Sequence, residues 1–217
     1  MRVNLPARAA AAQQRRAKTR ERLLDAASRL IADKGPDAAS VEDIAAAAGV
    51  SRGTFYNYFP TTDDLIHALN TRSAQAILAP LGELARRIED PALRLAAAAH
   101  LALVSMIADP TRAWVLLRLE GSRAPRQTPS SQFMDRLFEA GVSAGQFSGI
   151  DLDAARSFTL GALRNAARDL LLEGASCDLG EHVVAMILRG LGMPEAQARA
   201  VSAEGRAMAG GFALEAA

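Results

Sequence analysis

Residues 40–59 predict two short helices joined by a tight turn, and no other feature constrains the fold of this chain as strongly. Ser40 and Asp43 are spaced as in a capping box, with Asp43 in the place of the usual Glu or Gln. Gly49 should end the first short helix, and Ser51 should cap the second only two residues later. Two short helices around a glycine turn are the skeleton of a helix-turn-helix, whose second helix enters the major groove of DNA.

The rest of the chain also has the pattern of helices, so we expect an all-α fold. Alanine, the best helix former, is abundant, and no segment alternates β-branched and polar residues as a strand would. A first helix should run from about residue 19 to residue 34, where Gly35 and Pro36 stop it. Thr61 or Thr62 should cap a fourth helix. The first helix has one apolar stripe: Leu23, Ala27, Leu30 and Ile31.

The formal net charge of +1 conceals an uneven distribution along the chain. Residues 1–22 hold seven arginines and lysines against Glu21 alone, a net charge of +6, so the remaining 195 residues carry −5. Such asymmetry is typical of a basic arm that binds a polyanion beside an acidic body. A solvated, disordered tail without a binding role fits the charge equally well.

Cysteine usage and hydropathy indicate a cytoplasmic protein without a membrane span. Cys177 is the only cysteine, which excludes an internal disulfide framework and suits a reducing compartment. We expect no apolar run as long as the roughly 18 residues that a membrane span needs. Residues 1–17 contain arginines but no apolar stretch of the kind that a secretory signal has.

The segment Arg52 to Phe59 should divide into a core face and an outer face. Phe55 and Phe59 are one helical turn apart, so we expect them to be buried together. Arginine can pair with guanine and asparagine with adenine, while tyrosine hydroxyls are common phosphate donors. In the alternative interpretation the tyrosines only shield a small core and Gly53 is incidental. The outer face and its shoulders carry the other side chains: Arg52, Gly53, Thr54, Tyr56, Asn57 and Tyr58.

Residues 19–69 combine an apolar helix ended by Gly35, the Ile44-Ala45 pair, the turn Ala48-Gly49-Val50-Ser51 and the aromatic segment from Thr54 to Phe59. In this combination they resemble the DNA-binding domain of the TetR family of bacterial regulators. The resemblance implies an N-terminal three-helix helix-turn-helix domain that binds double-stranded operator DNA. It also implies a larger C-terminal helical domain for dimerisation and ligand binding.

The resemblance further implies which residues contact DNA. The family usually has a lysine at the position of Thr62, so that charged contact with phosphate is absent here. One hypothesis is that the basic arm compensates, through Arg15, Arg16, Lys18 and Arg20. We therefore expect a basic, flexible arm at 1–16, a DNA-binding domain at 17–77 and a sensing and dimerisation domain at 78–217. The expected DNA contacts are Ser40, Arg52, Gly53, Thr54, Tyr56, Asn57, Tyr58 and Thr62.

Two segments of the C-terminal half support a homodimer independently of the resemblance. Residues 183–188 are apolar all round, and residues 153–173 carry an apolar stripe, so two helices per chain could form a four-helix interface. Both could equally be ordinary core helices of one subunit. Candidates for the pocket of an unknown small-molecule effector are polar or aromatic residues on apolar helices: His100, Met106, Trp114, Arg118 and Asn165.

An enzyme is the remaining alternative class, and we expect the chain not to be one. Residues 141–145 match G-x-S-x-G around Ser143, and an aspartate and His182 follow in the order of a serine hydrolase. That motif works only on a sharp turn from strand to helix, and no strand is predicted here. The three histidines are scattered, so we expect no metal and no cofactor. A helical interaction protein that has lost DNA binding stays open because of Thr62. The resemblance thus implies a homodimeric repressor that a small-molecule effector releases from its operator.

Overall fold

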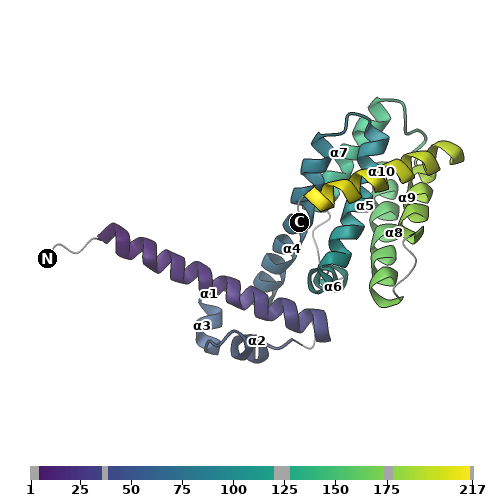
Figure 1. Ribbon diagram of the computed structural model, residues 1–217. Coiled ribbons are helices and arrows are strands. Elements are labelled where there is room, and N and C mark those ends of the chain that lie inside the picture. The colour runs from purple at the N-terminus through teal and green to yellow at the C-terminus, as the bar shows by residue number, and fades with distance from the viewer. Residues whose placement is uncertain (1–4, 36–38, 120–127, 174–177, 216–217) are drawn as a thin grey trace. The chain divides into compact units, whose positions relative to one another are not determined.

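The computed structural model describes residues 5–35, 39–119, 128–173 and 178–215, and all regular structure within these ranges is α-helical (Figure 1). This confirms the predicted all-α fold. Pro36 and Cys177, on which two expectations relied, lie outside these ranges. The helices are α1 (Leu5–Lys34), α2 (Val41–Ala47), α3 (Arg52–Tyr56), α4 (Thr62–Arg86), α5 (Pro91–Ala108), α6 (Pro110–Leu119), α7 (Pro129–Ser143), α8 (Leu152–Glu173), α9 (Asp178–Gly190) and α10 (Glu195–Glu215).

The chain divides into two compact units. The first unit comprises Met1–Arg72 and Trp114–Leu119, and the second comprises Ser73–Ala113 and Glu120–Ala217. Helices α4 and α6 therefore each contribute one part of their length to each unit.

The core of the first unit is built from α1, α2, α3 and α4, and the end of α6 completes it. The apolar stripe predicted on the first helix is confirmed, because Leu23, Ala27 and Ile31 are fully buried and Leu30 packs against them. The other large buried side chains of this core are Leu24, Ile44, Phe55, Phe59, Leu65, Leu69, Val115 and Leu119.

The position of α6 corrects one expectation about the effector pocket. Trp114 and Arg118 belong to the first unit, where the Nη1 group of Arg118 donates a hydrogen bond to the carbonyl of Ile31 at 3.2 Å. The guanidinium also lies 5.4 Å from the Trp114 ring centroid. The same carbonyl of Ile31 also accepts from the backbone of Gly35, so Arg118 adds a second hydrogen bond in the last turn of α1, which is a structural role.

Helix α1 begins at Leu5, well before the start expected near residue 19. Residues 8–18 consist only of alanine, glutamine, arginine and lysine, all strong helix formers, and no residue among them breaks the helix. From residue 12 to residue 18 every side chain is exposed. The apolar stripe marks only the part of α1 that covers the core, which is why it did not reveal the helix start.

Helix α5 is the central helix of the second unit and packs against α7, α8, α9 and α10. Its contact with α10 is close, since a Cβ atom on Gly205 would lie 2.7 Å from the Cβ of Ala96. The 18 residues Pro91–Ala108 are long and apolar enough to cross a membrane, so the expectation that no run reaches this length was wrong. Half of the helix is buried inside the protein, which is typical of a core helix.

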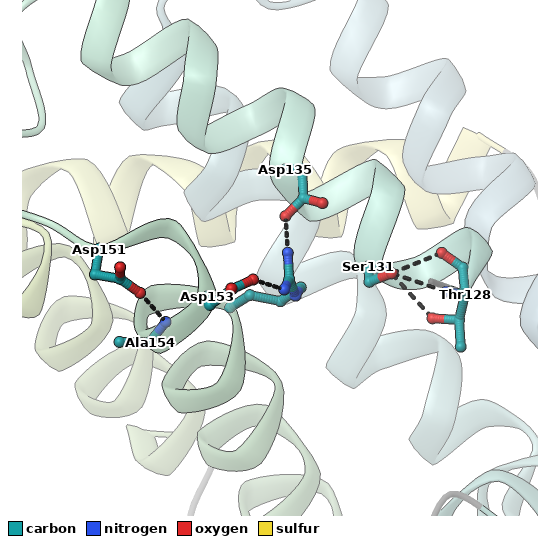
Figure 2. Close-up of polar contacts among 7 residues, drawn as sticks. Thr128, Ser131, Asp135, Asp151, Asp153 and Ala154 are labelled. Atoms are coloured by element: carbon teal, nitrogen blue, oxygen red, sulfur yellow. Dashed lines mark hydrogen bonds and ion pairs between the residues drawn. The ribbon is translucent and has the colours of Figure 1, made fainter. Parts of the chain in front are cut away.

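Polar contacts fix α7 at its start and against α8 (Figure 2). Thr128 and Ser131 form a capping box at the start of α7, in which each side chain accepts a hydrogen bond from the other's backbone N–H group. The Nη1 group of Arg156 in α8 donates to Asp135 in α7 at 2.5 Å, and Asp153 is a second acceptor for the same guanidinium. One face of α7 is thereby tied to α8.

Candidate nucleic-acid interface

The turn between α2 and α3 has the local chemistry that the sequence predicts. The hydroxyl of Ser40 accepts a hydrogen bond from the backbone of Asp43 and donates one to its carboxylate, at 3.1 and 2.8 Å. Ser51 caps α3 in the same way, by accepting from the backbone of Thr54 at 3.1 Å. Gly49 adopts a φ of +64°, which favours glycine over any other residue. These three residues set the direction in which α3 leaves the turn.

The predicted division of α3 into two faces is confirmed. Phe55 and Phe59 are buried, with ring centroids 5.9 Å apart. The helix itself is shorter than expected, because it ends at Tyr56 and Asn57 serves as its C-cap. On the outer side Tyr56 is 40% exposed, and Arg52, Gly53 and Asn57 are exposed as well. Thr54 and Tyr58 are half-buried, and Tyr58 packs against the core of the first unit.

Arg52 is held at the start of α3 by two neighbours. Its Nη1 group lies 2.7 Å from a carboxylate oxygen of Glu42, and its guanidinium lies 5.7 Å from the ring centroid of Tyr56. A hydrogen bond to Tyr56 and, after it, the charge of Glu42 raise the pKa of Arg52 above its ordinary value. Arg52 is therefore a positioned, permanently charged donor, and the carboxylate of Glu42 competes with any other acceptor for one part of its guanidinium.

Two hydroxyl groups that the resemblance places at DNA are occupied within the chain. Ser40 bonds Asp43, and Thr54 shares a hydrogen bond of 2.9 Å with Ser51. Ser40 donates its only hydroxyl hydrogen to Asp43, so it must break that bond before it can donate to a phosphate. Thr54 can donate to another acceptor when Ser51 is the donor of the bond that they share.

Thr62 is the first residue of α4 and is exposed. The cap belongs to Thr61, whose hydroxyl accepts from the backbone of Asp64 while Asp64 accepts from the backbone of Thr61, both at 3.1 Å. Because Thr61 carries the cap, the side chain of Thr62 has no part in it. Asp63 and Asp64 place two carboxylates in this first turn, and that of Asp64 accepts hydrogen bonds from Thr61.

Arginines from the exposed part of α1 lie against the end of α3, a contact that the sequence did not reveal. Arg16 donates to the carbonyl of Asn57 at 3.4 Å, and its guanidinium lies 5.5 Å from the ring centroid of Tyr58. Arg20 lies 5.3 Å from the ring centroid of Phe59. Arg16 and Arg20 are one helical turn apart and therefore share one face of α1. The helix predicted from the apolar stripe begins at about residue 19, after Arg16, and so it does not reveal this shared face. Within the first unit, arginines of α1 thus contact the residues that directly follow α3, and Figure 1 shows the α1 ribbon beside α3.

The G-x-S-x-G segment lacks the geometry of a hydrolase. Ser143 is the last residue of α7, so the segment follows a helix where the nucleophile elbow requires a strand. Gly141 is explained by packing, because a Cβ atom there would lie 2.1 Å from the ring of Phe147. Gly145 adopts a φ of +69° just after the helix. Gly141 therefore leaves room for the Phe147 ring, and Gly145 permits the turn that follows α7.

The histidines do not form a metal site in the part of the chain that the structure describes, where no group of three His, Cys, Asp or Glu side chains could hold an ion. His100 is buried in α5, and its Nε2 atom lies 3.2 Å from the hydroxyl of Ser202. Ser202 donates to the carbonyl of Glu181 at 2.8 Å, so it accepts from a neutral His100. Burial lowers the pKa of His100 to about 4, against the raising effect of the Ser202 bond. His100 is a satisfied core residue.

Comparison with known proteins finds relatives of the segment that contains α2 and α3. Residues 23–69 match the model of the family described as bacterial regulatory proteins, tetR family. The HTH-type transcriptional repressor LfrR of Mycolicibacterium smegmatis is 48% identical over 54 residues, which are 25% of this chain and 28% of that protein. The HTH-type transcriptional regulator YvdT of Bacillus subtilis is 47% identical over 49 residues, 23% of this chain and 25% of that protein. The chain thus matches only about a quarter of the length of these curated relatives.

One solved structure extends the similarity along almost the whole chain. The crystal structure of RolR in complex with resorcinol is 28% identical, with a TM-score of 0.60, and the match covers 88% of this chain and 95% of that one. The similarity therefore includes helices of both compact units.

Proposed function

We propose that this chain is a member of the tetR family of bacterial regulatory proteins and a sequence-specific DNA-binding transcriptional regulator, because its residues 23–69 match the model of that family. Residues 17–77 form the DNA-binding domain in this proposal, residues 1–16 a basic arm and residues 78–217 a sensing and dimerisation domain. The observation that carries the proposal is the division of α3. Phe55 and Phe59 anchor the helix in the core, while Arg52, Gly53 and Asn57 are left exposed together.

The proposed contacts follow from the position of each side chain. Arg52 and Asn57 have the donor geometry for guanine and adenine edges in the major groove. Exposed Gly53 lets the backbone of α3 come close to the DNA. Thr54, Tyr56 and Tyr58 add contacts to phosphates and neighbouring bases, and Ser40 and Thr62 contact phosphate from the first turns of α2 and α4. Arg16 and Arg20 supply the positive charge that Thr62 lacks.

We propose that the regulator binds DNA as a homodimer. The segment 183–188 is buried within its own subunit except at Val183 and Met186, and the stripe predicted over residues 153–173 is buried at Ala155 and Ala166 but not at Phe158. Phe158 in α8 is 51% exposed and Met186 in α9 is 60% exposed, and a Cβ atom on Gly190 would lie 3.4 Å from the Phe158 ring. Exposed aromatic and methionine side chains on two helices that pack together are typical of an interface. Two subunits would place two α3 helices in successive major grooves, about 34–36 Å apart or a multiple of that distance.

We propose further that the protein is a cytoplasmic repressor, released from its operator by a small-molecule effector. The names of LfrR, a repressor, and of RolR with resorcinol support this assignment by similarity. A ligand can act on DNA binding only if it prefers the released conformation. Helices α4 and α6 provide continuous backbone from one compact unit to the other, through which such a preference can act.

Fluorescence anisotropy with labelled DNA from the region upstream of the protein's own gene tests the proposal. We expect the logarithm of the affinity to fall linearly with the logarithm of the salt concentration, by about 0.9 per phosphate neutralised. Deleting residues 2–16 should reduce both affinity and slope, because Arg15 and Arg16 are lost. Arg199→Ala is the matched control, since Arg199 is an exposed arginine of α10 that pairs with Glu195. No binding, or binding without salt dependence, would instead favour a helical interaction protein without DNA binding.

A further inference from the structure

A cavity of about 650 Å³ lies within the second unit, lined by residues of α4, α5 and α7. This volume is in the range typical of small-molecule sites. Part of its wall is apolar and comes from Leu78 in α4 and from Phe133 and Leu137 in α7. Leu137 is buried, and Leu78 and Phe133 are half-buried, so an apolar ligand body would lose water on entering.

The remaining wall carries three arginines, one from each of the three helices: Arg86, Arg94 and Arg136. Arg94 donates through Nε to the carbonyl of Ile88 at 2.9 Å and through Nη2 to that of Glu89 at 3.2 Å. These bonds fix the guanidinium without neutralising it, and Nη1 takes part in neither. Arg136 is exposed and lies 5.9 Å from the Phe133 ring centroid. Within the described part of the chain, no carboxylate is within ion-pair distance of Arg94 or Arg136.

The net charge of the side chains around the cavity is positive even when the nearby carboxylate of Glu83 is counted. Glu83 forms an ion pair with Arg86 and also lies 3.7 Å from Arg87, so it offsets the positive charge at this side of the cavity. Arg94 and Arg136 keep their charges. Pro129, at the start of the 15-residue helix α7, also lines the cavity, so the positive end of the α7 dipole adds to the field of the arginines.

We propose that this cavity binds a small organic anion with an apolar body, and that such an anion is the effector of the regulator. The guanidinium of Arg136 and the Nη1 group of Arg94 bind its carboxylate, while Phe133, Leu137 and Leu78 cover its hydrocarbon part. The effector role rests on the proposed function, but binding of the anion does not. The ligand contacts α4, which is one of the two helices that continue into the first unit. Its binding therefore acts on a helix that belongs to the same unit as α3 over its first part.

Isothermal titration calorimetry of the full chain without DNA tests the binding. The probes are decanoate and decanol, which share their hydrocarbon chain and differ in the charge of the head group. We expect saturable binding of one decanoate per subunit and at least tenfold weaker binding of decanol, because a charge-assisted hydrogen bond is lost. Undetectable decanoate binding, or equal affinity for both probes, overturns the proposal.

Two variants with opposite expected effects locate the site. Arg136→Gln should weaken decanoate binding about tenfold. The variant should fold normally, because Arg136 is exposed and packs over the ring of Phe133, one turn away in the same helix. Glu83→Gln should strengthen binding several-fold, because it frees Arg86 from its carboxylate. Arg199→Gln, distant in sequence and not part of the cavity, is the control and should leave the affinity unchanged. Unchanged affinity in Arg136→Gln would contradict the site.

A second readout separates this inference from the function on which it rests. Decanoate should release labelled operator DNA from the wild-type protein, and from Arg136→Gln only at about tenfold higher concentration. If the protein binds no DNA at all, the proposed function fails while the calorimetric result stands. If it binds DNA and decanoate binds without releasing the DNA, the cavity is an anion site but its role as the effector site is refuted.

Discussion

Two glycines of the helix-turn-helix should respond oppositely to the same substitution, because one occupies a strained turn and the other a regular helix. Gly49 has a φ of +64°, and a Cβ atom there would lie 2.9 Å from the Nη2 atom of Arg22. Arg22 donates a hydrogen bond to the carbonyl of Ala48. A side chain at Gly49 therefore meets an unfavourable backbone conformation and displaces a bonded arginine.

The cost of Gly49→Ala can be worked from these contacts. The left-handed conformation costs an alanine about 1–2 kcal/mol. Displacing Arg22 removes one hydrogen bond, worth about 1 kcal/mol. We expect Gly49→Ala to lower the free energy of unfolding of the first unit by about 2–3 kcal/mol.

Gly53→Ala is the matched comparison. Gly53 is helical, and the nearest atom to a Cβ placed on it would be the Ser51 hydroxyl at 3.9 Å, so alanine fits without strain. Because alanine favours a helix over glycine by up to about 1 kcal/mol, Gly53→Ala should stabilise the protein slightly. The same methyl group should weaken DNA binding about tenfold if the backbone of Gly53 approaches the DNA, as proposed.

Urea unfolding followed by tryptophan fluorescence measures these changes. Trp114 is the only tryptophan and belongs to the first unit, so its emission reports on the unit that contains both glycines. Circular dichroism should show unchanged helix content in both folded variants. The reasoning is refuted if Gly49→Ala unfolds within about 0.5 kcal/mol of the wild type, or if Gly53→Ala is the more destabilising of the two.

Three further predictions concern charge, association and pH. Glu42→Gln should raise operator affinity several-fold in low salt, measured by anisotropy, because no carboxylate then competes with DNA for Arg52. An unchanged affinity would argue against a role for that ion pair. Phe158→Glu should convert the dimer to a monomer in sedimentation equilibrium, because it buries a charge in the proposed interface; a stable dimer would place the interface elsewhere. Burial lowers the pKa of His100 to about 4, so its neutral form stabilises the fold above pH 6.5, and up to about 3 kcal/mol is lost as the pH falls from 6.5 to 4. His100→Gln should flatten this part of the pH–stability curve, and an identical slope in the variant would exclude His100 as its cause.

The helix-turn-helix could be predicted because its determinants are local in sequence. Ser40 and Ser51 lie three residues before the backbone N–H groups that they cap, and Gly49 marks the turn between them. The burial of Phe55 and Phe59 follows from their spacing of one helical turn. None of these features depends on a distant part of the chain.

Features that depend on tertiary contacts could not be predicted in the same way. Val115 and Leu119 have the spacing of any apolar helix, and nothing in that spacing shows that they complete the core of the first unit. The expectation that Trp114 and Arg118 line a pocket of the C-terminal domain is wrong for the same reason. The arginine cavity has no signal in the sequence, since Arg86, Arg94 and Arg136 come from three different helices and each one alone resembles a surface residue.

The central claim is that the outer face of α3 reads DNA sequence, and Arg52 tests it most directly. The measurement is the ratio of affinities for the upstream operator and for single-base variants of it, at fixed salt, for wild type and Arg52→Ala. If Arg52 binds a guanine, the variant should lose about ten- to hundredfold in operator affinity and lose discrimination at one base position only. A uniform loss on every sequence would make Arg52 a phosphate contact, and unchanged affinity and discrimination would contradict the claim.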